Sequence, residues 1–342
     1  MKKWAIPFFA FILLLFGCNS GNNINDNSIN ETSISQNWAI ALHGGAGGNA
    51  KGISQEKILE YEKELIKALE LGVELIESGE LALDVAQQVV VFLEDSPLFN
   101  AGKGAVKTYD GFYELDAAIM DGSTLNAGAI AGVRDIKNPI KAARAVMDSS
   151  KHLLLIGQGA SLFAKNLGLE IVENSYFSTQ SREEQHKQLI SGKENPDPRG
   201  TVGCVVRDLN GDLAAATSTG GMSGKRWGRV GDVPVIGAGT YANNSTVAVS
   251  GTGHGEYWIR RVVAYDISAL VEYKGLSLDS AAHEVIFNKI DPMGGSGGGI
   301  IAVDSNGEVS LVFNTDLMHR AWASYKGDKW VGVLKNKQRE VK

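Results

Sequence analysis

Thr201 stands where two unlike stretches of the chain meet. A polar segment broken by prolines, residues 196–199, leads to Gly200, and the apolar run 202–206 begins directly after the threonine. A hydroxyl is a weak nucleophile unless a base lies beside it. If the chain broke before Thr201, the free α-amine, with a pKa of roughly 7.7–8, would supply that base. Gly200 has no side chain to block attack on its carbonyl, so the junction suits an N-terminal nucleophile. The ordinary alternative is a simple strand start.

Further hydroxyl and charged groups follow the junction. Strand alternation places Thr217 and Thr219 on one face, beside the strand that begins after Gly200. A turn at residue 231, a glycine, lets Arg229 and Asp232 point the same way. A guanidinium and a carboxylate held together match the α-carboxylate and α-ammonium of an amino acid. A surface salt bridge is the alternative for such a pair.

Glycines mark residues 250–256, Ser-Gly-Thr-Gly-His-Gly-Glu, which lead into a predicted helix. Such a helix start exposes backbone N–H groups and suits an anion or an oxyanion, although a plain glycine-rich cap has the same sequence. Other motifs are weaker. Residues 45–50 fit the dinucleotide pattern G-x-G-x-x-A, but the acidic residue that should end a second strand falls in a helical stripe. The histidines show no metal-binding spacing.

The composition is that of a globular protein. Of 342 residues, 44% are hydrophobic and 21% are charged, and the formal net charge is −6 without a long basic run. Nucleic acid is therefore not an expected partner. Cys204 lies inside the apolar run after the junction and is expected to be a small buried hydrophobe.

The N-terminus is typical of an exported protein. Lys2 and Lys3 precede an apolar stretch, residues 4–16, which is short for a membrane span and predicts a signal peptide over residues 1–17. Cys18 follows a small residue, as in the lipid-attachment box of bacterial lipoproteins; ordinary cleavage near Gly17 is the alternative. Residues 18–36 predict a flexible tether. We therefore expect an exported bacterial lipoprotein, periplasmic or membrane-anchored, that touches a membrane only through its lipid.

The rest of the chain alternates strand and helix patterns. The strands are expected at residues 38–42, 114–120, 127–133 and 152–156, and the helices after Ser54, at 81–93, from Pro139 and from about Gly159. Residues 179–199 are charged and lack periodicity, which predicts an exposed loop. Central Asn-Gly pairs predict hairpins over residues 205–216 and 300–313, with helices at 256–271 and 278–288 between them. These elements predict one α+β domain in which helices cover sheets.

Several short motifs occur in a specific order between residues 38 and 322. They are HGGAG at His43, FNAGKGAV at Phe99, ELDAAIMDG at Glu114, GAIAGV at Gly128, GTVG at Gly200, TSTGG at Thr217, GRVGD at Gly228, GAGTYANN at Gly237, TGHGE at Thr252 and GGSGGG at Gly294. With these motifs the chain resembles the plant-type asparaginase/isoaspartyl peptidase family of N-terminal nucleophile hydrolases. The resemblance implies a four-layer αββα fold and cleavage between Gly200 and Thr201. It also implies an α chain of residues 37–200, a β chain of residues 201–342, and a dimer of such pairs.

The resemblance assigns roles to individual residues. The nucleophile would be Thr201, lined by Thr219 and Asn100. Arg229, Asp232 and the backbone of Gly255 would hold the substrate, and Thr252 with the Gly253 N–H would form the oxyanion hole. A structural sodium ion would be held by backbone carbonyls, those of Leu93, Glu94, Ser96, Phe99, Ala101 and Lys103.

The resemblance also implies an activity. The protein would hydrolyse the β-aspartyl amide of L-asparagine and of β-aspartyl (isoaspartyl) dipeptides without an organic cofactor. Two alternatives stay open: glycosylasparaginase, the sister family, and a non-catalytic lipoprotein that binds aspartyl compounds. The motif FNAGKGAV and the glycine before Thr201 favour the asparaginase branch, and the full set of threonines favours catalysis. Residues 222–227 and 313–320 depart from the family's pattern and are expected to border the leaving group.

Overall fold

The computed structural model describes residues 37–47, 50–192, 200–295 and 297–341. The predicted signal peptide (1–17), the predicted lipidation site Cys18 and the predicted tether (18–36) lie outside the described residues. Among the helices that are described, none combines the length and the apolar character needed to span a membrane.

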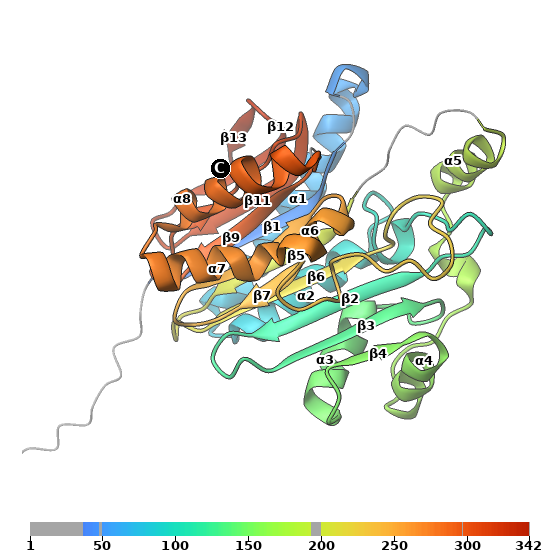
Figure 1. The fold of residues 1–342 in the computed structure, drawn as a ribbon, viewed down its shortest axis with the longest axis horizontal. Coiled ribbons are helices and arrows are strands. Elements are labelled where there is room, and N and C mark those ends of the chain that lie inside the picture. Colours follow the sequence, from blue (N-terminus) through green and yellow to red (C-terminus); the bar gives the residue numbers. More distant parts are fainter. Residues whose placement is uncertain (1–36, 48–49, 193–199, 296, 342) are drawn as a thin grey trace, which may run out of the picture. The chain divides into compact units, whose positions relative to one another are not determined.

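Nine strands form the larger sheet. They are β1 (Ala39–Ala46), β2 (Leu115–Asp121), β3 (Ala127–Val133), β4 (Leu154–Ile156), β5 (Val202–Arg207), β6 (Leu213–Thr219), β11 (Leu317–Ser324), β12 (Lys329–Leu334) and β13 (Gln338–Glu340). Their order is β13-β12-β11-β1-β5-β6-β2-β3-β4, and all neighbours are antiparallel except β3 and β4. Because β1 pairs with β5, residues before and after the Gly200–Thr201 junction share this sheet (Figure 1).

A second, four-stranded sheet packs against the larger one. It consists of β7 (Thr240–Ala242), β8 (Val247–Thr252), β9 (Gly299–Asp304) and β10 (Val309–Ser310), in the order β10-β9-β8-β7. A buried apolar layer between the sheets joins Val205 and Ala215 of the larger sheet to Ala248 and Ile301 of the smaller one. This layer leaves the outer face of each sheet to be covered by helices.

Helices cover both outer faces. On the larger sheet lie α1 (Gln55–Glu77), α2 (Ala82–Asp95), α3 (Pro139–Ser149) and α4 (Gly157–Asn166). On the smaller sheet lie α6 (Gly255–Arg261), α7 (Val263–Lys274) and α8 (Leu278–His283), which continues as the π-helix η4 (Glu284–Ile290). The short 3₁₀ turns are η1 (Ala50–Gly52), η2 (Gly102–Gly104), η3 (Asn174–Phe177) and η5 (Asp291–Met293). The predicted α+β, four-layer αββα sandwich is confirmed (Figure 1).

Strand alternation explains why the central strands are buried on both faces. On β1, Ile40 and Leu42 face the helices, whereas Ala39 and Ala41 face the second sheet. α1 approaches this strand closely at Gly72, where an added Cβ would lie 2.3 Å from Ile40 Cδ1. Ser54 caps the same helix by accepting a hydrogen bond from the Lys57 N–H at 3.1 Å, as its sequence predicts. Cys204 is fully buried in the helix-side core, also as predicted.

One predicted loop is a helix in the structure. Residues 179–199 were expected to be irregular, but α5 (Gln180–Ile190) forms there, with the Thr179 hydroxyl as its N-cap. None of its residues is fully buried. The helix therefore lacks the periodic apolar positions from which a helix is predicted. Its residues are instead good helix formers, and its hydrogen bonds run through polar side chains to the rest of the chain. The prediction of a loop over residues 180–190 was therefore wrong.

A packing prediction follows from β3 and α3. A Cβ added to Gly128 would lie 2.1 Å from Ala143 O and 2.6 Å from Met147 N, both backbone atoms that cannot rotate away. We expect Gly128→Ala to lower the free energy of unfolding by about 2–3 kcal/mol. Gly159 of α4 has no neighbour within 4 Å of an added Cβ. There, Gly159→Ala should raise stability by roughly 0.5–1 kcal/mol. Chemical denaturation of both variants checks this; equal effects would contradict the packing account.

Candidate active site

Thr201 lies buried at the start of β5, facing the second sheet. Only 7% of its surface is exposed. Gly45 of β1 passes directly beside the junction, because a Cβ on this residue would lie 2.5 Å from Gly200 Cα. Gly45 also has a φ of 107°, a left-handed conformation that favours glycine. The Gly-Gly sequence at the end of β1 thus lets the chain approach the junction closely.

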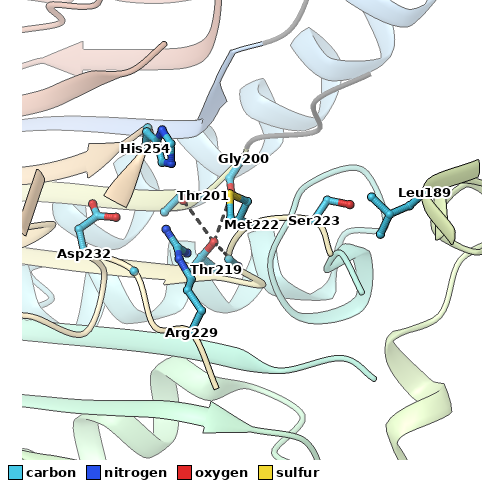
Figure 2. Close-up of a pocket in the computed structure, with 12 residues that line it drawn as sticks. Leu189, Gly200, Thr201, Thr219, Met222, Ser223, Arg229, Asp232 and His254 are labelled. Atoms are coloured by element: carbon cyan, nitrogen blue, oxygen red, sulfur yellow. Dashed lines mark hydrogen bonds between the residues drawn. The ribbon is translucent and has the colours of Figure 1, made fainter. Parts of the chain in front are cut away.

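The carbonyl of Gly200, directly before Thr201, is hydrogen-bonded. Asn100 Nδ2 donates to Gly200 O at 2.8 Å, and Thr219 Oγ1 donates to the same oxygen at 3.2 Å. Thr201 Oγ1 in turn donates to Thr219 Oγ1 at 3.2 Å (Figure 2). The predicted nucleophile, Thr219 and Asn100 are therefore brought together, and two donors polarise the carbonyl next to the threonine hydroxyl.

Asn100 is held in this orientation by its other bonds. Its Oδ1 accepts from Val106 N at 2.9 Å, and its Nδ2 also donates to Gly221 O at 2.8 Å. The side chain is 2% exposed. These partners fix which end of the amide faces Gly200, because only the NH₂ group can donate.

His43 forms a hydrogen bond with the backbone of Thr201, a role that was not predicted from the sequence. Its Nδ1 lies 2.7 Å from Thr201 O, and its Nε2 lies 3.0 Å from Ser250 Oγ. Because a carbonyl only accepts, Nδ1 carries the proton and Nε2 accepts from the serine. Burial lowers the pKa of His43 to about 3, despite the opposing bond to Thr201, so the ring stays neutral.

The contacts of His43 continue into a buried row of hydroxyls. Ser250 Oγ lies 2.8 Å from Thr217 Oγ1, which lies 2.8 Å from Thr240 Oγ1. Gly203 makes room for this row, because its Cβ would lie 2.0 Å from Ser250 Oγ. Thr217 and Thr219 lie on the same face of β6, as predicted. Thr217 belongs to this row of buried hydroxyls, whereas Thr219 lines the cavity.

Arg229 and Asp232 lie together beside the same cavity, as predicted. A Cβ on Gly255 would lie 2.8 Å from Asp232 Oδ1 and 2.9 Å from Arg229 Nη2, so the first residue of α6 must be small. Arg229 also pairs with Glu256, through Nε at 3.0 Å and Nη2 at 2.9 Å. Glu256 stands in the TGHGE motif, but its pairing with Arg229 was not predicted.

Burial acts on the pKa values of both groups of this pair, and neighbouring charges oppose it. Desolvation raises the pKa of Asp232 to about 7, although Arg229 opposes the shift. Asp232 Oδ2 is buried without a hydrogen-bond partner among the described residues. Burial alone would lower the pKa of Arg229, but its bonds to Glu256 outweigh this and the net shift is upward. The site therefore holds the Arg229 cation beside a carboxyl group whose Oδ2 atom lacks a hydrogen-bond donor among the described residues.

A cavity of about 280 Å³ joins these groups. Its walls comprise Leu189, Gly200, Thr201, Thr219, Gly221, Met222, Ser223, Arg229, Gly231, Asp232, Gly253 and His254. Figure 2 shows Asp232 on one side of Thr201 and Ser223 and Leu189 on the other. This volume is near the lower end for a small-molecule site, which is roughly 300–1,000 Å³.

The two predicted oxyanion-hole residues are placed differently. Gly253 lines the cavity with Thr201. Thr252 ends β8 and is 1% exposed; its Oγ1 accepts a hydrogen bond from Ala46 N at 3.2 Å. The Thr252 hydroxyl keeps its own proton, which can still be donated.

The departures from the family pattern also separate. Met222 and Ser223, from the region 222–227 that was predicted to border the leaving group, line the cavity. Of the described residues 313–320, none lines it; Leu317 and His319 line a second cavity of about 220 Å³ that shares Gly200. The prediction that this second region borders the leaving group is therefore wrong: β11 carries it behind the junction instead.

Known proteins share this sequence pattern. The model of a family described as asparaginase matches residues 36–333. The chain is 50% identical over 304 residues to an isoaspartyl peptidase of Salmonella typhimurium, covering 84% of this chain and 96% of that protein. It is 40% identical over 326 residues to a probable isoaspartyl peptidase/L-asparaginase 2 of Arabidopsis thaliana, covering 86% and 98%. It is also 40% identical over 298 residues to a plant-type L-asparaginase of Pyrococcus abyssi, covering 83% and 95%.

The chain belongs to the asparaginase family. The predicted resemblance to plant-type asparaginases and isoaspartyl peptidases is thereby confirmed, and the protein is an amidohydrolase of this type acting on small molecules. The asparaginase-family motifs at Asn100, Thr201, Arg229 and Gly253 all meet at one cavity or its rim.

The predicted sodium loop has suitable donors in this asparaginase-family fold. The last carbonyls of α2, those of Leu93 and Glu94, belong to a helix C-terminus, which carries partial negative charge. Gly102 folds back on this end, where an added Cβ would lie 2.3 Å from Glu94 O, and Gly104 packs on the following loop, where an added Cβ would lie 2.1 Å from Phe99 O. Carbonyl oxygens are hard ligands that suit a cation of this kind.

The side chain of Lys103, whose carbonyl is one of the predicted donors, contacts a neighbouring ring. The Lys103 ammonium lies 4.7 Å from the ring centre of Tyr176, which turns it outward. Among the described residues, no group of three or more His, Cys, Asp or Glu side chains is arranged to hold a metal. A cation here would therefore depend on the backbone.

A pH prediction follows from the buried carboxyl of Asp232. Its folded pKa of about 7 lies above its ordinary value of 3.8, so this group stabilises the folded state below about pH 4 and loses that contribution as pH rises through 7. We expect Asp232→Asn to raise the free energy of unfolding by about 2–4 kcal/mol at pH 8 and to make no difference near pH 4. Denaturation curves at both pH values test this. A destabilised variant at pH 8 would contradict the assigned cost of the buried charge.

Proposed function

We propose that this protein cleaves itself before Thr201 and then hydrolyses the β-aspartyl amide of L-asparagine and of β-aspartyl dipeptides. The observation that carries the proposal is the environment of the Gly200 carbonyl. Asn100 and Thr219 donate to it, while Thr201 Oγ1 lies in hydrogen-bond contact with Thr219. Thr201 would serve first in breaking the chain's own peptide bond and then in attacking the substrate's amide.

Self-cleavage would begin with attack of Thr201 Oγ1 on the Gly200 carbonyl carbon. The new C–O bond forms, the Gly200 C–N bond breaks, and the hydroxyl proton passes to the departing nitrogen. Asn100 and Thr219 stabilise the negative charge that develops on Gly200 O. Water then hydrolyses the ester, leaving a carboxylate on Gly200 and both a free hydroxyl and a free α-amine on Thr201.

The same threonine would then act on the substrate. Its α-amine accepts the hydroxyl proton as Thr201 Oγ1 attacks the side-chain carbonyl of the bound aspartyl group. The Gly253 N–H and the Thr252 hydroxyl would donate to the charge that develops on the carbonyl oxygen. Ammonia or an amino acid takes the proton from the amine and leaves, and water releases aspartate from Thr201. This sequence needs no organic cofactor.

Arg229 and Asp232 would fix the aspartyl head. The guanidinium binds the α-carboxylate, sharing or replacing its contact with Glu256, and the α-ammonium supplies the donor that Asp232 Oδ2 lacks. An ammonium beside Asp232 also favours its charged form. The clamp thus recognises a free amino-acid head and leaves only the side-chain amide at Thr201.

The relatives' names support this branch of the family. They are isoaspartyl peptidases and L-asparaginases, whereas glycosylasparaginase would need space and polar partners for a sugar. The leaving-group side of the cavity includes Leu189 and Met222, which suit an amino acid better. A non-catalytic aspartyl-binding protein would not need Asn100 and Thr219 on the Gly200 carbonyl.

Three further features belong to the proposal. A sodium ion would be held by the carbonyls of residues 93–103, where it would stiffen the loop that carries Asn100. Two cleaved pairs of α and β chains would associate as a dimer. The mature protein would be exported and anchored by a lipid on Cys18.

The maturation step is tested on a denaturing gel. We expect the purified protein to give two fragments, the smaller beginning Thr-Val-Gly-Cys, and Thr201→Ala to remain a single inactive chain. Asn100→Ala should slow cleavage by about 10²–10³-fold, the effect of losing one oxyanion donor. N-terminal sequencing and a time course measure both. A wild type that stays uncleaved yet fully active would refute the mechanism.

Substrate choice tests the clamp. A β-aspartyl dipeptide offers a free α-carboxylate and a free α-amine, whereas an α-aspartyl dipeptide has its carboxylate consumed in the peptide bond. Leaving a buried charge unpaired costs several kcal/mol, so selectivity should reach about a hundredfold or more. Product release from matched β-Asp-Leu and α-Asp-Leu checks this. Similar rates on the two would rule out the clamp, and turnover of glycosylated asparagine alone would move the protein to the sister family.

A further inference from the structure

The leaving group of a substrate must point away from Arg229 and Asp232. Asp232 lies to one side of Thr201 and Arg229 lies below it in the view of Figure 2, while Met222, Ser223 and Leu189 line the cavity on the other side of Thr201. Leu189 belongs to the last turn of α5, the helix that the sequence did not predict. The wall beyond the reactive carbonyl is therefore partly built by the segment that precedes the cleavage junction.

From this arrangement we infer that α5, through Leu189, is a specificity element that selects β-aspartyl dipeptides with an aliphatic leaving residue such as leucine or methionine. The inference rests on the proposed function, because it needs an aspartyl head at Arg229 and a reactive carbonyl at Thr201. Leu189 and Met222 present carbon and sulfur atoms to a leaving side chain, which gain by removing it from water.

Leu189 is packed against the loop that carries Met222. A Cβ on Gly224 would lie 2.6 Å from Leu189 Cδ2, so the leucine fills the space that this glycine leaves. Gly224 has a φ of 71°, which also favours glycine. The two apolar walls of the leaving-group side are thus in contact with one another.

Both walls are tied to the same short segment, Lys107 to Tyr109. The Lys107 ammonium lies 2.7 Å from the Glu183 carboxylate of α5, and Lys107 O accepts from Gly224 N at 2.8 Å. Tyr109 N donates to Lys225 O at 3.0 Å, and Tyr109 O accepts from His186 Nε2 of α5 at 3.1 Å. Each residue therefore joins α5 to the 222–227 loop.

These ties persist at neutral pH and hold a helix that has no buried stripe. The hydrogen bond from Lys107 holds the pKa of Glu183 down at about 2, so this ion pair stays charged. Arg182 adds a bond from Nε to Gly104 O at 2.7 Å. On the other wall, Lys225 is 2% exposed and donates to Glu114 O at 2.9 Å, which anchors the 222–227 loop to the residue before β2. These bonds hold Leu189 and the 222–227 loop in place on the leaving-group side of the cavity.

The size of the leaving group determines whether Leu189 and Met222 affect the kcat/KM of a substrate. Ammonia, released from asparagine, is about as large as a water molecule and does not extend along the cavity from Thr201. A dipeptide's second residue does extend, and its side chain meets Leu189 and Met222. The ratio of kcat/KM between two dipeptides isolates this contact, since head recognition and chemistry are common to both.

The test compares β-Asp-Leu with β-Asp-Gly in the cleaved, full-length protein. We expect the wild type to prefer β-Asp-Leu about tenfold, and Leu189→Ser to lower that preference about fivefold, the scale of one aliphatic contact in a partly open site. Ile190→Ser is the matched control. Ile190 is the next residue of the same helix, is 52% exposed and is not among the residues that line the cavity, so its replacement should leave the preference unchanged.

A charge at the same position gives an independent check. Leu189→Arg should raise kcat/KM for β-Asp-Glu relative to β-Asp-Leu by about tenfold or more, because it places a cation on the leaving-group side. An unchanged preference in both Leu189 variants, or equal wild-type rates on β-Asp-Leu and β-Asp-Gly, would overturn the inference. A wild type that hydrolyses neither dipeptide nor asparagine would strike the proposed function instead.

Discussion

The pairing of β5 between β1 and β6 is the constraint on which the site depends. This pairing places Thr201 at the N-terminal end of the buried strand β5, beside Gly45 on one side and Thr219 on the other. The larger sheet interleaves strands from residues 37–192 with strands from residues 200–341. A break before Thr201 therefore cuts one connection and leaves the hydrogen bonds of the sheet in place, so the nucleophile can be freed without loss of the fold.

Patterns with a local physical cause were predicted well from the sequence. Asn210-Gly211 specifies its hairpin through turn chemistry, Ser54 starts α1 by capping, and the two-residue period of β6 places Thr217 and Thr219 on one face. Thr201 and Thr219 were singled out by residue type and spacing and Asn100 by a family motif, and the structure brings the three into hydrogen-bond contact. Features set by residues that are close in the sequence, such as a helix cap, a turn or the face of a strand, can therefore be predicted from the sequence alone.

Contacts between distant, unremarkable residues were not predicted. α5 has no apolar stripe, because polar side chains such as Arg182 and Glu183 tie it to the chain. His43 gains its role only when β1 and β8 bring it between Thr201 and Ser250. β11 and β12 were also missed. Arg320, in the middle of β11, interrupts an apolar reading, and its buried guanidinium is accommodated by backbone carbonyls that only the fold supplies.

The central claim is that Thr201 forms a covalent aspartyl ester common to all substrates. The direct measurement is partitioning of that ester between water and hydroxylamine. If the intermediate is shared, asparagine and β-Asp-Leu must give the same ratio of β-aspartyl hydroxamate to aspartate at each hydroxylamine concentration, although their rates differ. Ratios that depend on which substrate is supplied, or hydroxamate formation by Thr201→Ala, would contradict the account.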